Sequence, residues 1–235
     1  TVEVVARRGV NVSAIDATEG SDDRSLAASC AVLGAAVGVF GITFGVGSVA
    51  AGGSVAMTCV MSLLVFTGAS QFSAVSVIAS GGSTAAALAG ASLLAARNGV
   101  YGLAMSRTLR GSLLKRILAA QITIDESTAM STAQEEPQAA RVAFWWTGLS
   151  VYVFWNAGTL IGALAGNAID PEKFGLDAAF PAGFVAMVMP HLRHRSGRRA
   201  AGIGALVCAV TIPFTPAGVP ILCASVGVLL GVKKP

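Results

Sequence analysis

Two groups of polar residues interrupt otherwise apolar stretches of the sequence, and they carry the side chains best suited to chemistry. The first group is residues 67–71 (Thr-Gly-Ala-Ser-Gln), and the second is residues 97–99 (Arg-Asn-Gly). A polar or charged group inside a lipid-spanning stretch is costly to bury, so it is usually kept where it faces a partner, a cavity or a substrate path. These residues therefore predict a solute-binding site within a bundle of membrane helices.

The first group brings three hydrogen-bonding side chains, Thr67, Ser70 and Gln71, within about one helical turn. If the helix is interrupted at Gly68, the amides that follow are exposed at a helix start, which transporters commonly direct at a substrate carboxylate. Ser70 and Gln71 would then add hydrogen bonds to the same solute. The alternative is hydrogen bonding between helices without any ligand, because small polar residues often hold membrane helices together.

The second group contains an intramembrane cation, Arg97, whose guanidinium matches a carboxylate in a bidentate manner. We consider it a candidate for binding a substrate carboxylate. The alternative is a structural ion pair with Asp125 or Asp177, because buried charge is usually paired. Asn98 and Asn156 are weaker candidates for the same site.

An acidic pair, Asp125 and Glu126, follows Thr123 and predicts the start of a short helix. Thr123 and Glu126 are three residues apart and could form a capping box. Acidic groups at the edge of a membrane bundle often take part in proton relays, so this pair is a candidate for proton coupling or gating. The alternative is a capped, solvated helix start.

The composition of the chain supports a membrane protein and argues against other classes. The 235 residues are 54% hydrophobic and only 12% charged, with a mean hydropathy of +0.72, which an ordinary soluble domain does not have. No basic stripe interleaved with aromatic residues indicates nucleic-acid binding. The sequence also lacks the HExxH, P-loop and GxSxG patterns, and its four cysteines are isolated. We therefore predict no catalytic residues, no metal site and no cofactor.

Apolar windows long enough to cross a bilayer predict an all-α, polytopic integral membrane helix bundle of about seven spans, some broken by glycine or proline. Residues 1–25 form a polar amino-terminal tail, and residues 26–235 a single transmembrane transporter domain. The windows lie near residues 27–50, 54–80, 83–106, 141–168, 176–192, 199–213 and 216–232.

The connection over residues 107–140 is rich in basic residues and predicts the orientation of the chain. Lys and Arg concentrate on the cytoplasmic side of membrane proteins, so we expect this segment to be cytoplasmic and the amino-terminal tail to lie outside. Within it, residues 113–122 combine leucine and isoleucine at helical spacing with Lys115 and Arg116. This pattern predicts a short amphipathic helix on the inner membrane surface.

Glycines recur at helical spacing in the first and fourth windows. Gly34, Gly38, Gly41 and Gly45 share one helix face, and residues 158, 162 and 166 repeat the pattern. In lipid, small residues allow helix backbones to approach closely, so we expect another helix to pack tightly on each stripe.

Several motifs together resemble a known family, the large subunit of bacterial branched-chain amino acid exporters of the AzlC or YgaZ type. The matching segments are residues 41–45 (Gly-Ile-Thr-Phe-Gly), residues 65–72 (Val-Phe-Thr-Gly-Ala-Ser-Gln-Phe), Arg97 with residues 101–102, residues 125–126, and residues 175–180 (Gly-Leu-Asp-Ala-Ala-Phe). They cover most of residues 27–190. The sequence departs from the family around Arg97, where the pattern Asn-x-Arg-His is replaced by Ala-Ala-Arg-Asn.

The resemblance implies a multi-pass protein of the bacterial cytoplasmic membrane that exports L-valine, L-leucine or L-isoleucine, and methionine, in exchange for protons. It also implies a small separate membrane subunit of the AzlD or YgaH type. The residues alone support a bundle in the lipid bilayer with an intramembrane polar site. They leave open a passive small-solute channel and a non-transporting scaffold or intramembrane enzyme. Polar residues clustered at two interrupted helices favour binding near the midplane and alternating access.

Overall fold

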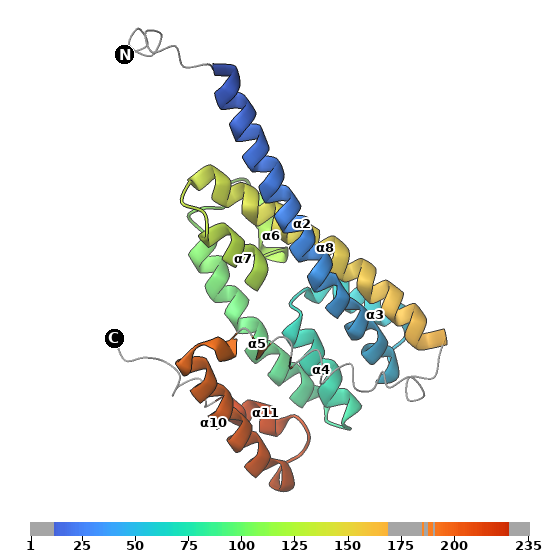
Figure 1. Cartoon of the computed structure of the whole chain (residues 1–235). Helices are drawn as coiled ribbons and strands as arrows, with labels where there is room; N and C mark the ends of the chain where they lie inside the picture. The colour runs from blue at the N-terminus through green and yellow to red at the C-terminus, as the bar shows by residue number, and fades with distance from the viewer. Residues whose placement is uncertain (1–11, 169–184, 186–187, 190, 226–235) are drawn as a thin grey trace.

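The computed structural model describes residues 12–168, 185, 188, 189 and 191–225, and within these ranges it contains helices and no β-strand (Figure 1). The helices in chain order are α2 (Val12–Ala50), α3 (Val55–Val65), α4 (Ala69–Ala79), α5 (Thr84–Met105), α6 (Leu113–Gln121), α7 (Asp125–Thr132), α8 (Pro137–Ala168), the 3-10 turn η3 (His191–Arg193), α10 (Arg195–Thr211), the 3-10 turn η4 (Ile212–Phe214) and α11 (Val219–Ala224). The described part of the chain is therefore all-α, as the sequence predicts.

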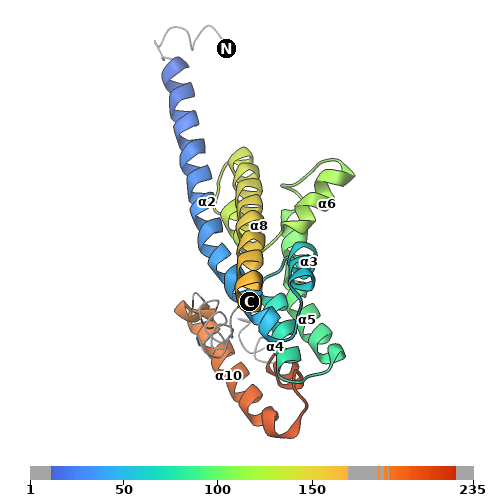
Figure 2. The ribbon, with the colours of Figure 1, turned by 90° about the vertical axis from the view of Figure 1, so that its right-hand side faces the viewer.

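The two longest helices, α2 and α8, lie side by side and form the most extensive helix contact among the described residues (Figure 1, Figure 2). Their glycine stripes face each other. A Cβ atom on Gly38 would lie 2.8 Å from the Cβ of Phe154, and one on Gly162 would overlap the backbone of Ile42. The expectation that a helix packs tightly on each stripe is confirmed, and the two stripes pack on one another.

The second apolar window, 54–80, forms two short helices, α3 and α4, separated by residues 66–68. The interruption expected at Gly68 is present. Serine side chains fix the starts of several helices, because a serine hydroxyl can accept a hydrogen bond from an otherwise unpaired amide of the first turn. Ser54 accepts from Met57 N at α3, and Ser83 accepts from Ala86 N at α5.

Two helices in the described part of the chain are long and apolar enough to cross a membrane, over Ser25–Ala50 and Pro137–Gly166. They correspond to the first and fourth apolar windows. The third window is α5, and the sixth falls in α10 and η4. Most of the fifth window, and the seventh beyond residue 225, lie outside the described residues.

Helix α2 begins at Val12, within the segment 1–25 that the sequence predicts to be a polar amino-terminal tail. A polar sequence does not prevent a helix, since residues such as Ala, Glu and Arg have favourable helix propensities.

Large apolar side chains cover the outer faces of the long helices. Examples are Val39 on α2, Leu103 on α5 and Ile161 on α8, all of them exposed. Apolar side chains on the outside suit helices that pack with lipid.

The interior holds an aromatic cluster in which the centres of the Phe44 and Trp155 rings stack 6.1 Å apart. The buried members of this core are Phe44, Phe66, Phe72, Val75, Ile124, Val151 and Trp155.

Candidate functional site

The break between α3 and α4 is stabilised by one of its own side chains. Gly68 adopts φ +60°, a left-handed conformation that favours glycine. The carbonyl oxygen of the Gln71 side chain accepts hydrogen bonds from Thr67 N at 3.4 Å and from Gly68 N at 3.1 Å. The Thr67 and Ser70 hydroxyls hydrogen-bond to each other. Gln71 therefore occupies amides at the break that would otherwise be open to a ligand.

An ion pair links α5 to α7 beside this break. Nη1 of Arg97 lies 2.7 Å from Oδ2 of Asp125, and each side chain is 32% exposed. The ion pair considered as the alternative for Arg97 is thus present with Asp125; Asp177, the other candidate partner, lies outside the described residues. Because both groups remain accessible, a soluble ion can reach them without the bundle unfolding.

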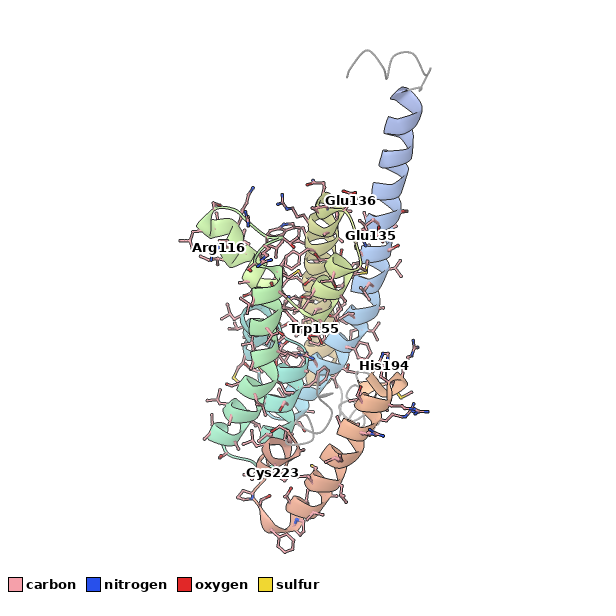
Figure 3. The ribbon with its side chains drawn as sticks, turned by 90° about the vertical axis from the view of Figure 1, so that its left-hand side faces the viewer. Arg116, Glu135, Glu136, Trp155, His194 and Cys223 are labelled. Carbon is pink, nitrogen blue, oxygen red and sulfur yellow. The ribbon has the colours of Figure 1, made fainter. Side chains whose placement is uncertain are left out.

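The ion pair lies in a cavity of about 500 Å³ formed mainly by α2, α5, α7, α8 and the α3–α4 break. Its wall combines charged and polar groups with aliphatic and aromatic side chains. Trp155, one of the lining residues, lies near the middle of the bundle (Figure 3). The cavity is lined by Val37, Phe40, Phe66, Thr67, Gly68, Arg97, Asn98, Tyr101, Ile124, Asp125, Glu126, Thr128, Ala129, Val151 and Trp155.

Several polar atoms of the lining residues are buried and have no hydrogen-bond partner within the described part of the chain. Two are acceptors, Oδ1 of Asn98 and Oδ1 of Asp125, and one is a donor, Nε1 of Trp155. The Thr128 hydroxyl is also unpaired. Buried polar groups are nearly always hydrogen-bonded in native proteins, so these unpaired groups mark a part of the bundle with unused hydrogen-bonding capacity.

The structure separates the predicted site residues into two groups. Thr67, Gly68, Arg97, Asn98, Asp125 and Glu126 line the cavity. Ser70 and Gln71 are completely buried beside it and are not among its lining residues. Asn156 is also outside the lining and donates its side-chain amide to the carbonyl of Tyr152.

Two polar lining residues, Tyr101 and Thr128, were not anticipated from the sequence. Tyr101 lies four residues after Arg97 on α5, so both share one helix face. Its hydroxyl interacts with the Asp125 carboxylate. Thr128 lies three residues after Asp125 on α7, again on the same face. The helical spacing from the two charged residues was the signal that could have identified both.

The helix that carries Asp125 and Glu126 starts differently from the expected capping box. The N-cap residue of α7 is Ile124, whose backbone amide donates to the Ser127 hydroxyl at 3.1 Å. Thr123 does not cap the helix, because its hydroxyl donates to the carbonyl of Ala119 at 2.7 Å. The capping-box prediction is therefore wrong.

Glu126 lies half-buried beside the ion pair, and burial raises the pKa of its carboxyl group. Asp125 adds to this shift, because two neighbouring carboxylates repel, whereas Arg97 opposes it. The carboxyl group of Glu126 therefore keeps its proton to a higher pH than an ordinary glutamate.

Among the described residues, no three His, Cys, Asp or Glu side chains are grouped so that they could hold a metal ion. Cys30 is buried and accepts a hydrogen bond from the Thr147 hydroxyl at its sulfur atom.

The cavity around the Arg97–Asp125 ion pair combines charged, polar and apolar side chains. The chemistry that it supports is reversible binding of a small charged or zwitterionic solute.

Comparison with known proteins agrees with this description. The chain is 26% identical over 203 residues to the branched-chain amino acid transport protein AzlC of Bacillus subtilis, covering 83% of this chain and 79% of that protein. It is 23% identical over 176 residues to an uncharacterised membrane protein of Helicobacter pylori, covering 74% of this chain and 77% of the relative. No solved structure matches the chain.

The family comparison covers all of the residues that line the cavity around Arg97. Residues 32–169 match the AzlC protein family, and this range includes about half of α2, from residue 32 onward, and all of α3 to α8. The resemblance suggested by the sequence motifs is confirmed. Because the match extends over more than half of the sequence, this chain belongs to the AzlC family.

Proposed function

We propose that this protein is a secondary transporter that exports branched-chain amino acids, L-valine, L-leucine and L-isoleucine, together with methionine, across the bacterial cytoplasmic membrane. The export is coupled to protons, and the protein works with a small membrane subunit of the AzlD or YgaH type. Membership of the AzlC family and the name of the Bacillus subtilis relative support this proposal. The relatives named as membrane proteins support its location.

The observation that carries the proposal is the composition of the cavity wall around Arg97 and Asp125. An apolar amino acid has a carboxylate, an ammonium group and an aliphatic side chain, and the wall has a partner for each. The Arg97 guanidinium suits the carboxylate. Asn98 and Asp125 line the same cavity, and side-chain oxygens of an amide and a carboxylate are acceptors suited to the ammonium group.

The remaining wall suits an aliphatic side chain, because Val37, Phe40, Phe66, Ile124 and Val151 supply apolar surface. The volume of about 500 Å³ falls within the roughly 300–1,000 Å³ typical of small-molecule sites. An apolar wall alone discriminates weakly among leucine, isoleucine, valine and methionine, since one methylene group changes binding by only about 1–3 kcal/mol. A broad specificity for small apolar amino acids follows.

Proton coupling in this proposal resides in Asp125 and Glu126. The two carboxyl groups are adjacent in the chain and line the same cavity as Arg97. A substrate ammonium group that binds the Asp125 carboxylate competes with a proton for that group. Substrate and proton would then exclude each other, as the exchange of an exported amino acid for protons requires.

The bundle has about seven spans in this proposal, with the basic first part of the 107–140 connection on the cytoplasmic side and α7 entering the bundle, where Asp125 pairs with Arg97. The unpaired cavity atoms lie close to the α3–α4 break, and discontinuous helices near the bilayer midplane are a recurrent feature of transporter sites. This arrangement suits alternating access of the cavity to the two sides.

The test is the flux of radiolabelled L-valine in sealed vesicles that contain the full chain, with and without the co-expressed small subunit, under an imposed pH gradient. We expect saturable valine flux that changes with the gradient and is inhibited by L-leucine. Flux that does not saturate would identify a passive channel instead. No valine flux from correctly inserted protein with its small subunit would contradict the proposal.

A further inference from the structure

A second cavity, of about 600 Å³, lies between the end of α5, the connection to α6, and α6 itself. It shares no lining residue with the cavity around Arg97. Figure 3 shows Arg116, one of its lining residues, toward one end of the molecule, whereas Trp155 lies near the middle. The two cavities are thus separate, and the amino acid site does not account for the second one.

The helix that forms one wall, α6, is held to the bundle at its carboxyl end. The side-chain amide of Gln121 donates to the carbonyl of Leu63 at 2.9 Å, and Ala119 and Ile122 pack in a buried cluster with Met105 and Phe144. The other face of the helix is apolar and uncovered in the described structure. Its exposed members are Leu113, Leu114, Ile117 and Leu118.

The cavity wall has a strong charge asymmetry. Arg110 and Arg116 line it, both are exposed, and neither forms an ion pair among the described residues. The lining contains no acidic side chain. Glu135 and Glu136 lie toward the same end of the molecule but are not lining residues (Figure 3).

The rest of the lining is largely apolar, with Met105, Leu109, Leu113 and Ile117 beside the two arginines. A guanidinium group binds phosphate through paired hydrogen bonds, and an apolar wall favours hydrocarbon. A free phosphate ion would gain nothing from these aliphatic side chains. A molecule with an anionic phosphate at one end and an acyl chain at the other satisfies both parts of the wall.

We infer that this cavity binds an anionic phospholipid of the surrounding membrane, with the lipid phosphate between Arg110 and Arg116 and acyl-chain carbon against Leu113 and Ile117. Clusters of basic residues next to an amphipathic helix bind anionic headgroups at membrane surfaces. The inference is independent of which solute the protein transports.

The experiment is native mass spectrometry of the purified full chain, titrated with phosphatidylglycerol or with phosphatidylcholine. We expect the chain to retain phosphatidylglycerol in preference to phosphatidylcholine. The double variant Arg110→Gln/Arg116→Gln should weaken this binding by about tenfold or more. The matched control Arg107→Gln/Lys115→Gln removes the same charge from exposed residues outside the cavity lining, and should change binding by less than about threefold.

A second pair of variants tests the apolar part of the cavity without altering charge. Ile117→Gln should weaken phosphatidylglycerol binding, whereas Leu118→Gln, on the same helix but outside the lining, should leave it unchanged. If both variants of either pair lost phosphatidylglycerol binding equally, the inference would be overturned, because the lipid would then be attracted to α6 in general rather than bound in the cavity. Displacement of the lipid by millimolar inorganic phosphate would identify a free-anion site instead. Loss of a co-purifying small subunit from the arginine double variant, with lipid binding unchanged, would identify a protein interface.

Discussion

The contact between α2 and α8 and the contact between α5 and α7 bring helices together by different means. In the first, opposed glycines let two backbones approach so closely that an added Cβ atom would overlap the neighbouring helix. In the second, an ion pair between Arg97 and Asp125 joins helices that otherwise touch little, because α7 packs mainly on α8. One contact depends on shape along two long helices, and the other on charge at a single point.

This difference indicates which part of the bundle is a frame and which part responds to a ligand. Close packing along α2 and α8 is a sum of many small contacts, and no solute can replace it. An ion pair of two accessible groups can be replaced by another ion that binds one of them more favourably. We therefore expect the α2–α8 pair to stay fixed during transport and the α5–α7 contact to open and close.

The largest expected effect is that of Gly162→Ala on the α2–α8 contact. The added Cβ would overlap the backbone of Ile42, and overpacking of this kind destabilises by about 1–3 kcal/mol and occasionally more. We expect a clear fall in the melting temperature of the detergent-solubilised protein and a loss of folded protein from the membrane. The matched control is Gly99→Ala on α5, where a Cβ meets no atom within 4 Å. Equal melting temperatures for the two variants would show that the helix pair is not closely packed.

Arg97→Ala should have the largest effect on transport without a comparable effect on membrane insertion. It removes the cation proposed to bind the substrate carboxylate and leaves Asp125 without its partner. Since a hydrogen bond to a charged group contributes roughly 1.5–3 kcal/mol, valine flux in vesicles should fall by at least about tenfold. Arg107→Ala, an exposed arginine outside the cavity, is the control. Wild-type flux from Arg97→Ala would remove this residue from the substrate site.

Gln71→Ala tests whether the α3–α4 break must keep its shape for transport. The side chain accepts hydrogen bonds from two amides of the break, and each such bond contributes roughly 1 kcal/mol. We expect valine flux to fall by about tenfold while the protein still inserts. Gln134→Ala provides the control, because the side-chain amide of Gln134, just beyond the end of α7, donates only to the carbonyl of Met130 among the described interactions. A normal KM and maximal rate in Gln71→Ala would mean that the break tolerates unpaired amides.

The smallest expected effect is that of Glu126→Gln, and it concerns pH dependence rather than rate. Burial raises the pKa of Glu126 above its ordinary value of 4.5, with Asp125 and Arg97 as its charged neighbours. In the folded protein this carboxyl group is protonated and neutral below pH 4.5, and it becomes charged only as the pH rises through the raised pKa. In the unfolded chain it loses its proton near pH 4.5, so the folded protein should lose stability as the pH rises from 4.5 to the raised pKa.

Glu126→Gln mimics the protonated form, so both the melting temperature and the valine flux should become less dependent on pH over the same interval. The change in flux at acidic pH should be less than about threefold. Glu136→Gln is the control, because Glu136 is exposed and should leave both pH profiles as they are. Identical profiles for wild type and Glu126→Gln would exclude this carboxyl group from coupling.

The sequence predicted the parts of the structure that depend on local chemistry. Glycine spacing predicted the close contact on α2 and α8, Gly68 predicted the break, and the intramembrane charge of Arg97 required a partner, of which Asp125 was one candidate. These predictions succeed because two arrangements are strongly disfavoured in a membrane bundle. One is an unpaired charge in lipid, and the other is a large side chain between two closely packed helix backbones.

The sequence did not predict which polar residues face the cavity. In a soluble helix the polar side faces water, but in a membrane bundle both the lipid-facing and the core-facing sides are apolar, so periodicity does not identify the inner face. Ser70 and Gln71 are consequently buried behind the cavity, whereas Tyr101 and Thr128 line it. Their placement follows from the rotation of α4, α5 and α7, which is set by tertiary packing.

The side chain of Gln71 has a further consequence for the helix break. Breaking a helix in hydrocarbon normally leaves amide groups that must be hydrated or covered by a neighbouring helix. Here the amides of Thr67 and Gly68 are paired with a residue only a few positions further along the chain. The interruption therefore carries a hydrogen-bond partner for these amides within its own segment, and they need neither water nor a neighbouring helix to be paired.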